Sequence, residues 1–305
     1  MRITQSMLSN NMLRNLSNSY SKMNTYMEQL STGKKINRPS DDPVIAMKGM
    51  GYRTQLTEVQ QYQRNTNEMH NWMDNSDAAL DKATQALQKL RELAVQASND
   101  TYDEEQRESI MEEAEQLKQH LIDIANTNVN GKYIFNGTDT DAAPISVDEN
   151  GDITKIGINS NPVMIEVSNG TKLKANVDAG EVFAGDSSND SANDVSNMFD
   201  EIDDFIAALG SDKREEIENS IGTLDANIDN VINARADLGA RMNRLDLIEN
   251  RLGEQEVIAT KTMSENEDID YEKVITELIT QESLHRAALS AGSRIIQPTL
   301  VDFLR

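Results

Sequence analysis

The sequence predicts a mainly α-helical fold: an elongated antiparallel helical bundle or coiled coil built from both chain ends, with a small inserted β-rich outer domain. The first reason is that residues 44–143 and 163–297 contain no proline, which leaves two windows long enough for extended helices. The second is that seven of the fifteen glycines lie between Gly131 and Gly185, together with two of the five prolines. The third is that apolar residues recur every three or four positions on both sides of this middle stretch.

The amino-acid composition excludes several classes of function. The 305 residues include 29 basic and 52 acidic side chains, a net charge of −23, and 37% are hydrophobic. Phosphate binding needs a basic face, so we expect no nucleic-acid partner. The absence of cysteine excludes disulfides, thiolate metal sites and cysteine nucleophiles. The acidity is concentrated in residues 101–230, which leaves two nearly neutral ends suited to packing against other protein.

The sequence carries no recognisable membrane or secretory segment. No apolar run approaches the roughly 18 residues of a membrane span. The first ten residues lack the apolar core of a secretory signal peptide. If this protein leaves the cell, we expect export by a route without a cleaved signal peptide.

The first forty residues predict one helix followed by a loop. The apolar positions of the helix have the a/d spacing of a coiled-coil seam. They are Leu8, Met12, Leu16, Tyr20, Met23, Met27 and Leu30. Thr32-Gly33 ends the helix, and a polar loop motif follows that includes Asn37, Arg38, Pro39, Asp41, Asp42 and Pro43.

Two more helices are predicted before the middle stretch. From Val44 the apolar pattern resumes over roughly 55 residues, which corresponds to a helix about 80 Å long. Asn99-Asp100-Thr101 breaks it, and Thr101 or Asp103 can cap the next helix. That helix ends in residues 126–130, with Gly131 as its left-handed cap.

The middle stretch predicts short strands and tight turns. Its alternating segments are Lys132–Phe135, Ile153–Ile158, Val163–Val167 and Lys172–Val177. Asn150-Gly151 and Asn169-Gly170 are hairpin-turn dipeptides. We therefore predict a small β-rich outer domain over residues 135–190.

Helix is predicted to return at about Ala192, and a second apolar seam extends from Ile217 to Leu252. After residues 266–270 a last helix carries Ile295 near its end. The chain closes in an apolar tail that one helix cannot bury alone. Its apolar residues are Leu300, Val301, Phe303 and Leu304. The predicted domains are 1–43 with 266–305 (terminal helices), 44–134 with 191–265 (helical bundle) and 135–190.

No set of residues predicts catalysis, a cofactor or a metal site. His70, His120 and His285 are far apart and share no ligand spacing, so each is expected to be an ordinary helix-surface or seam residue. No phosphate loop, nucleophile elbow or zinc motif is present. The acidic run 148–152 predicts a hairpin turn more simply than a calcium loop. We expect neither an enzyme nor a small-molecule substrate.

The fourteen methionines allow two interpretations. Several lie at helical spacing in the first third of the chain: Met7, Met12, Met23, Met27, Met47, Met50, Met69 and Met73. They can fill a seam within the chain. Alternatively, their flexible side chains let a surface pack against non-identical neighbours.

Several segments resemble the conserved ends of bacterial flagellins and their relatives. The segments are Met1–Thr4, Leu30–Pro43, Arg91–Ala97, Asn130–Gly137, Leu238–Arg244 and Leu300–Leu304. Two details are similar to the family's hook–filament junction members rather than to filament flagellin. Pro43 follows Asp41-Asp42 where flagellins usually have alanine, and the tail reads Val-Asp-Phe-Leu.

The resemblance implies a structural subunit of the flagellum, exported unfolded through a type III apparatus to an extracellular position. The implied partners are the preceding hook-associated protein, flagellin, further copies of this chain in a junction ring, and a cytoplasmic export chaperone on the carboxy-terminal helix. It also implies that both chain ends pair as helices and contact other subunits. The seam residues of the first helix, Ile295 and the apolar tail are therefore the expected interface.

Two other functions remain open at this point. One is a flagellin-type filament subunit that polymerises with itself. The other is a cytoplasmic coiled-coil adaptor, which long helices alone would permit.

Overall fold

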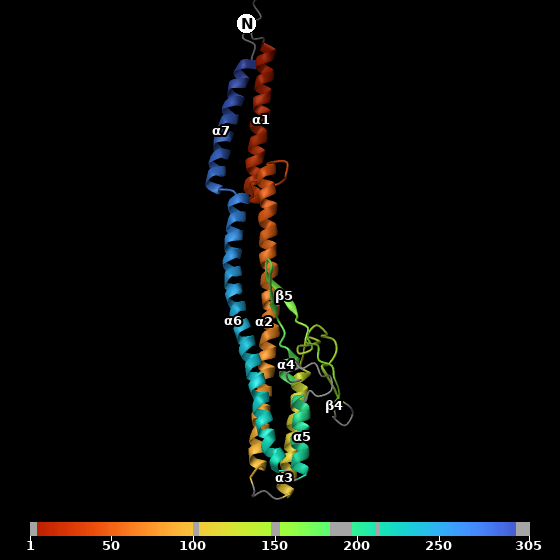
Figure 1. The fold of residues 1–305 in the computed structure, drawn as a ribbon. Coiled ribbons are helices and arrows are strands. Elements are labelled where there is room, and N and C mark those ends of the chain that lie inside the picture. Colours follow the sequence, from red (N-terminus) through yellow and green to blue (C-terminus); the bar gives the residue numbers. More distant parts are fainter. Residues whose placement is uncertain (1–4, 100–103, 148–152, 184–196, 212–213, 297–305) are drawn as a thin grey trace, which may run out of the picture. The chain divides into compact units, whose positions relative to one another are not determined.

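The computed structural model describes residues 5–99, 104–147, 153–183, 197–211 and 214–296. Long helices come from both chain ends, and small antiparallel strand pairs lie in the middle (Figure 1). The predicted mainly α-helical class with a β-containing middle is confirmed. Contacts group the chain into two compact units, residues 1–58 with 254–305 and residues 59–253. The predicted three-domain division stays a prediction.

The helices account for most of the described chain. They are α1 (Gln5–Thr32), α2 (Pro43–Ala97), α3 (Glu104–Ala125), α4 (Ala179–Phe183), α5 (Met198–Gly210), α6 (Arg214–Glu267) and α7 (Tyr271–Ile296). Among the described residues, no helix combines the length and the hydrophobicity needed to cross a membrane.

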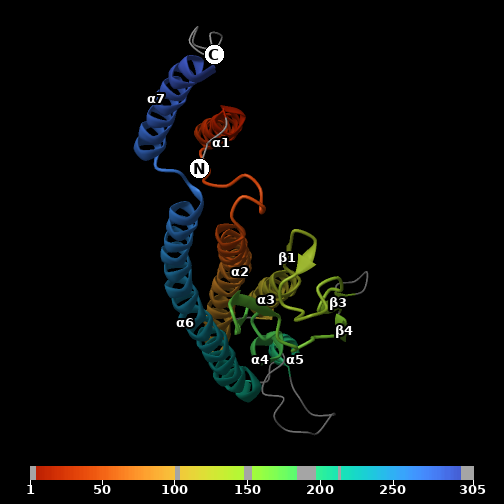
Figure 2. The same cartoon turned by 90° about the horizontal axis from the view of Figure 1, so that it is seen from above.

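The first unit contains α1, α7, the start of α2 and the end of α6. Helix α1 packs along α7, as both views show (Figures 1 and 2). The predicted breaks are confirmed: α1 ends at Thr32, and Gly33 follows with a φ of +71°. Helix α2 begins at Pro43 and is 55 residues long, as predicted.

The second unit has a continuous apolar core. Its largest fully buried side chains include Phe135, Phe183, Phe199, Phe205, Met69, Met73, Leu80, Leu87, Leu90 and Leu121. Phe183 meets Phe135 edge-on at a centroid distance of 5.6 Å and stacks on Phe199 at 6.1 Å. These rings join α4 to residue 135 and to α5, so the middle stretch contributes to the core.

Three antiparallel pairs make up the described β-structure. They are β1 (Asn128–Val129) with β2 (Lys132–Tyr133), β3 (Ile145–Val147) with β4 (Ile153–Ile156), and β5 (Met164–Ser168) with β6 (Thr171–Lys174). The predicted turn at Asn169-Gly170 is confirmed, because it joins β5 to β6. The predicted turn at Asn150-Gly151 lies outside the described residues.

The predicted role of Gly131 is wrong in one respect. Its φ is positive (+82°), but α3 has already ended at Ala125. Asn130 also has a positive φ (+54°), and the two residues connect β1 to β2. Two consecutive positive φ values are typical of a type I′ hairpin turn. Gly131 is therefore a hairpin residue instead of a helix cap.

The β5–β6 hairpin is tied to α2 and α6. The side-chain amide of Asn65 donates to the Glu166 carbonyl at 2.8 Å. Arg241 of α6 donates to the carbonyls of Lys174 (3.1 Å) and Asn176 (2.9 Å). These bonds satisfy backbone groups that would otherwise need water.

Helix returns after the middle stretch, as predicted, in two described segments, α5 and α6. Asn197 caps α5 by accepting hydrogen bonds from the amides of Phe199 and Asp200, both at 3.0 Å. Helix α5 then ends at Gly210 and α6 starts at Arg214. Residues 192–196, where the helix was expected to start, lie outside the described residues.

Candidate assembly interface

Helices α1 and α7 form an antiparallel pair with a heptad seam. Seven of the partly buried positions of α1 alternate in steps of three and four: Ser9, Met12, Leu16, Ser19, Met23, Tyr26 and Leu30. Six buried or partly buried positions of α7 follow the same rule: Val274, Leu278, Gln281, His285, Ala288 and Gly292. This is the spacing of a two-stranded coiled coil.

The seam is polar and small for a coiled coil. Gln281 donates a 2.8 Å hydrogen bond to Ser19 across it. Burial raises the pKa of the Tyr26 phenol above its ordinary value, and the neighbouring Glu277 carboxylate raises that pKa further. Leucine and isoleucine at such positions would bury more apolar area. The pair therefore has a weak interior for its length.

An exposed apolar surface runs beside this seam, and we call it the open apolar face. Its members are Leu13, Tyr20 and Met27 on α1 and Tyr271, Ile275, Ile279 and Leu289 on α7. At about 100° per residue, each stripe lies roughly a quarter turn from the seam of its own helix. Because the helices are antiparallel, the two stripes fall on the same side of the pair. Tyr20 and His285 meet on that side with a ring-centroid distance of 6.3 Å.

The predicted interface residues divide into three groups. Met12, Leu16, Met23 and Leu30 are partly buried in the α1–α7 seam, whereas Tyr20 and Met27 are exposed on the open apolar face. Leu8 and Ile295 lie in α1 and α7, but their side chains are not described. Leu300, Val301, Phe303 and Leu304 lie outside the described residues. Their role in subunit contacts stays a prediction.

The seam that α1 forms with α7 differs from the apolar sequence pattern at two positions. Ser19 and Tyr26 occupy the seam, and the neighbouring Tyr20 and Met27 do not. The sequence pattern favoured the more apolar residue of each neighbouring pair. The structure instead pairs Ser19 and Tyr26 with polar partners on α7.

A second feature of the first unit, the clasp, joins the end of α1 to the connection between α6 and α7. It consists of residues 33–35 and 267–269. The Lys35 amide donates to the Glu267 carbonyl at 2.7 Å, and the Ile269 amide donates to the Gly33 carbonyl at 3.1 Å. This short antiparallel bridge fixes the chain where α1 and α7 begin to run side by side.

Charged side chains reinforce the clasp. Glu267 is buried and accepts from Arg53 at 2.6 Å, with the Lys34 ammonium 3.5 Å away. Lys34 also donates to Asp268 at 2.6 Å. This bond, followed by one from the Ser264 hydroxyl, lowers the pKa of Asp268 below its ordinary value. A buried carboxylate requires such compensation.

The loop motif predicted from the sequence is a capping structure. Asp41 accepts from the amides of Asn37 (3.1 Å) and Arg38 (2.9 Å), which closes the turn around Pro39. Asp42 accepts from the amides of Val44 (2.9 Å) and Ile45 (3.1 Å) and so caps α2. Pro43 occupies the first helical position, where its missing N–H is not needed.

The methionines support both interpretations, at different places. Met69 and Met73 are fully buried in the core of the second unit. Met7, Met27, Met47 and Met50 of the first unit are more than half exposed. The exposed group supplies flexible apolar surface of the kind that accommodates non-identical neighbours.

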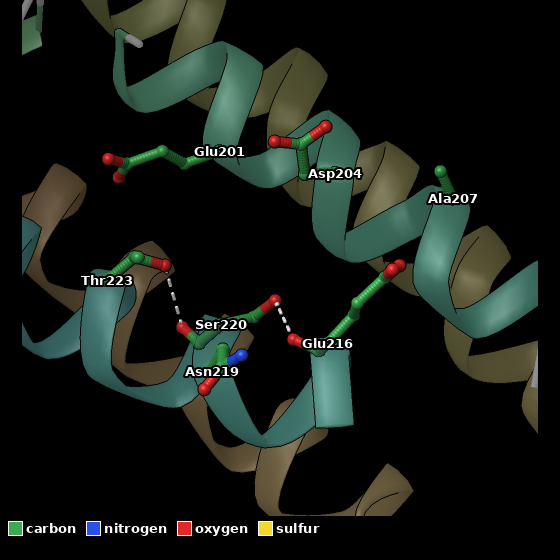
Figure 3. Close-up of a pocket in the computed structure, with 7 residues that line it drawn as sticks. All are labelled: Glu201, Asp204, Ala207, Glu216, Asn219, Ser220 and Thr223. Atoms are coloured by element: carbon green, nitrogen blue, oxygen red, sulfur yellow. Dashed lines mark hydrogen bonds between the residues drawn. The ribbon is translucent and has the colours of Figure 1, made fainter. Parts of the chain in front are cut away.

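The second unit has an open polar hollow between α5 and α6 (Figure 3). Its lining residues are Glu201, Asp204, Ala207, Glu216, Asn219, Ser220 and Thr223. The Ser220 hydroxyl donates to the Glu216 carbonyl at 2.8 Å, and the Thr223 hydroxyl donates to the Ser220 carbonyl at 3.0 Å. Both hydroxyls thus bond to their own helix, and no histidine, lysine or cysteine lines the hollow. It offers no activated nucleophile.

The histidines were expected to be ordinary surface or seam residues. His120 is exposed on α3, and His285 lies in the α1–α7 seam. His70 is different, because two carboxylates of α6 face it at hydrogen-bonding or ion-pair distance.

Both helical ends of the chain match known families. Residues 3–140 match the model of the bacterial flagellin N-terminal helical region, and residues 221–304 match that of the bacterial flagellin C-terminal helical region. The chain is 28% identical to flagellar hook-associated protein 3 of Escherichia coli K12, over 95% of this chain and 96% of that protein. It is 29% identical to the flagellin of Bacillus subtilis 168, over 94% of each.

A solved structure of a putative flagellar hook-associated protein from Vibrio parahaemolyticus has the same fold. Its TM-score is 0.67 at 22% sequence identity, over 75% of this chain and all of that one. The matching terminal regions contain α1, the clasp and α7, which are the parts that carry the candidate interface. With both of its helical ends matched, the chain belongs to the bacterial flagellin family.

Proposed function

We propose that this chain is a structural subunit of the bacterial flagellum, an adaptor at the hook–filament junction that is needed for flagellin assembly and motility. The observation that carries the proposal is the open apolar face on the α1–α7 pair. Seven large side chains are exposed there, and the α1–α7 seam beside them does not bury them. Such a surface is typical of a protein–protein contact.

The relatives favour a junction subunit over a filament subunit. Hook-associated protein 3 and flagellin both match nearly the whole chain, but hook-associated protein 3 matches from two organisms and the solved structure with the same fold is also of a hook-associated protein. An adaptor needs two different faces toward two different neighbours, which is a heterologous contact that does not close on itself. The proposed neighbours are the preceding hook-associated protein, flagellin and further copies of this chain. The proposed position is extracellular, reached without a cleaved signal peptide and with an export chaperone on the carboxy-terminal helix.

The test replaces two members of the open apolar face with acids. Leu13 and Met27 are 59% and 57% exposed, so Leu13→Asp with Met27→Asp should change monomer stability little. If neighbouring subunits cover these positions, two buried unpaired carboxylates should prevent junction assembly. The matched control is Asn15→Asp with Asn18→Asp, which adds the same two charges to exposed positions on another face of α1.

Each variant is introduced into a strain of the source bacterium that lacks the gene. Export of each variant is measured first, and hooks and filaments are then examined by electron microscopy. The Leu13 and Met27 variant should be exported and leave hooks without filaments, with flagellin released into the medium. The control should restore motility. Normal filaments with the Leu13 and Met27 variant would show that this face is not an assembly contact.

A filament subunit is the second candidate, because the similarity to flagellin covers nearly the whole chain. Purified monomer is incubated with short filament seeds of the source bacterium. A junction subunit should not elongate the seeds, whereas a filament subunit should.

A further inference from the structure

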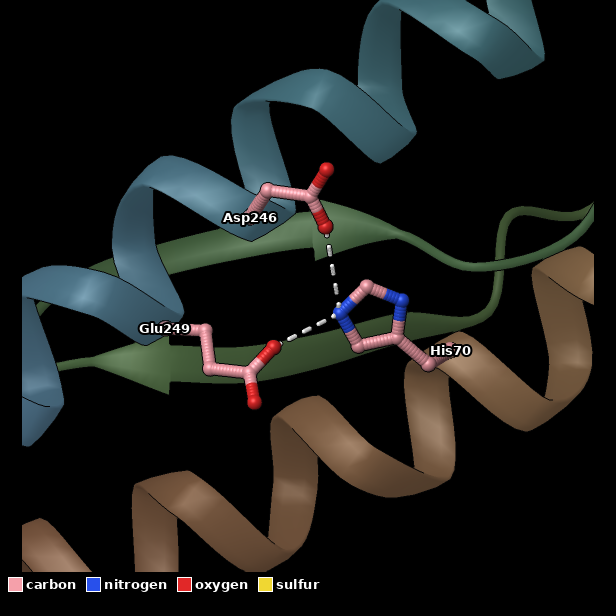
Figure 4. A group of neighbouring side chains, drawn as sticks. All are labelled: His70, Asp246 and Glu249. Carbon is pink, nitrogen blue, oxygen red and sulfur yellow. Dashed lines mark hydrogen bonds and ion pairs between the residues drawn. The ribbon is translucent and has the colours of Figure 1, made fainter.

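His70 of α2 lies opposite two acidic side chains of α6 in the second unit (Figure 4). Its Nε2 atom is 3.0 Å from Glu249 Oε2 and 3.5 Å from Asp246 Oδ1. One nitrogen and two carboxylate oxygens therefore converge, all within 4.8 Å of one another. We call these three residues the His70 cluster.

The backbone positions of the cluster are fixed by core packing. Asp246 and Glu249 are three residues apart and share one face of α6. Their neighbours Leu245 and Ile248 are buried, and Met69 beside His70 is completely buried. The three side chains can therefore change their relative positions only by rotating about their own bonds. The three side chains thus project from helix faces whose backbone positions are set by the buried core.

Hydrogen bonding within the cluster is incomplete. The Nε2 atom of an imidazole carries at most one hydrogen, so it can donate to one carboxylate at a time. The other carboxylate then receives no proton from the ring, and two like charges stand close together. A bound cation would interact favourably with both carboxylates at once.

We propose that His70, Asp246 and Glu249 bind a divalent transition-metal ion of the zinc type between α2 and α6. Calcium and magnesium prefer ligand sets made of oxygen alone, whereas zinc accepts imidazole nitrogen with carboxylate oxygen. Tetrahedral zinc with bonds of about 2.1 Å places its ligand atoms about 3.4 Å apart. The two separations from Nε2 lie on either side of that value.

The site would tie α2 to α6 from two distant parts of the sequence. Three protein ligands leave a fourth position for water or for a group from outside the chain. Metal binding to the folded state alone raises stability by mass action. The site lies in the second unit, whereas the proposed assembly contacts lie in the first.

The test uses the full chain without an affinity tag, in a buffer that does not chelate metals. Zinc chloride is titrated by isothermal calorimetry, and thermal unfolding is followed with and without zinc. We expect one saturable zinc site and a zinc-dependent rise in the unfolding temperature. Calcium and magnesium chloride at the same concentration should give neither.

Two variants remove ligands: His70→Gln, and Asp246→Asn with Glu249→Gln. Each should lower zinc affinity at least about tenfold, since loss of a ligand costs more than loss of an outer-shell partner. The controls are His120→Gln and the double change Glu215→Gln with Glu218→Gln, an exposed acidic pair of the same spacing on α6. Both controls should bind zinc as the original chain does. Circular dichroism checks that all variants are folded.

Cobalt chloride gives a second readout, because a nitrogen–oxygen site produces visible absorption bands that depend on His70. Absence of saturable zinc binding would overturn the proposal. So would zinc binding that the His70→Gln variant leaves unchanged.

Discussion

The carboxylate of Glu267 accepts a 2.6 Å hydrogen bond from the Arg53 guanidinium, 214 positions earlier in the chain. Glu267 is 4% exposed, whereas Arg53 reaches it from the helix surface. The pair joins the start of α2 to the end of α6 within the first unit. Glu267 lies directly against Gly49 of α2, which makes the clasp sensitive to a larger side chain at that glycine.

We expect Gly49→Ala to weaken the clasp. Alanine is the better helix former by about 1 kcal/mol. A Cβ atom at Gly49, however, would lie 2.6 Å from Glu267 Oε1 and 3.3 Å from its Cδ. The Glu267 side chain must shift, which strains its bond to Arg53. Loss of a hydrogen bond to a charged group costs about 1.5–3 kcal/mol, so after the helix-propensity gain we expect a net loss of about 0.5–2 kcal/mol. Hydrogen exchange of the α7 amides measures this loss as faster exchange.

Gly51→Ala is the matched control, two residues further along the same helix. A Cβ atom there has no neighbour within 4 Å among the described residues. We expect unchanged or slightly slower exchange in α7, because only the helix propensity changes. Equal exchange rates in the two variants would contradict the role given to Glu267.

The pairing of Lys34 with Asp268 predicts a pH dependence with a definite sign. The hydrogen bond from Lys34 lowers the pKa of Asp268 below 3.8. The contribution of the Lys34–Asp268 pair to stability is therefore complete above pH 3.8 and is lost as the pH falls through the lowered pKa of Asp268. The same bond raises the pKa of Lys34 above 10.5, so the contribution is also lost as the pH rises through that raised value.

Asp268→Asn isolates this contribution. At pH 6–8 the original chain should show slower exchange in α7 than the variant. The difference should vanish below the lowered pKa of Asp268, where both side chains are neutral. A difference that persists unchanged in acid would mean that charge at residue 268 is irrelevant to the clasp.

The helix boundaries were predictable because their causes are local. Gly33 supplies the positive φ that ends α1, and Pro43 with its capping Asp42 starts α2. The Asn169-Gly170 turn is equally local. In each case a few adjacent residues determine the backbone conformation, so the sequence contains the whole signal.

Contacts between distant residues were not predictable in the same way. Ser19 lies in the seam and accepts a hydrogen bond from Gln281. Which residue of α7 faces Ser19 depends on the register of α1 and α7, two helices far apart in the chain. His70 and Glu249 are 179 positions apart. The i, i+3 spacing of Asp246 and Glu249 was visible, but nothing local shows which histidine faces them.

The packing of the middle stretch against the helices also depends on contacts between distant residues. The turns and strands of that stretch predict an inserted domain, yet Phe183 is 1% exposed and packs against Phe135 and Phe199. Truncation of a buried phenylalanine typically costs about 3–5 kcal/mol. We therefore expect Phe183→Ala to destabilise the whole second unit.

Trp72, the only tryptophan, lies in the core of that unit on α2 and reports its unfolding by fluorescence. Urea unfolding of Phe183→Ala should shift the Trp72 transition to a lower urea concentration. Met164→Ala on β5 is the control, because Met164 is 49% exposed and its loss should change stability by no more than about 0.5 kcal/mol. If the middle stretch unfolds as a separate domain, Phe183→Ala will destabilise that stretch alone. The urea concentration at the midpoint of the Trp72 transition will then stay unchanged. A shifted Trp72 transition instead means that the β-containing stretch and the helices α2, α3, α5 and α6 unfold as one cooperative core.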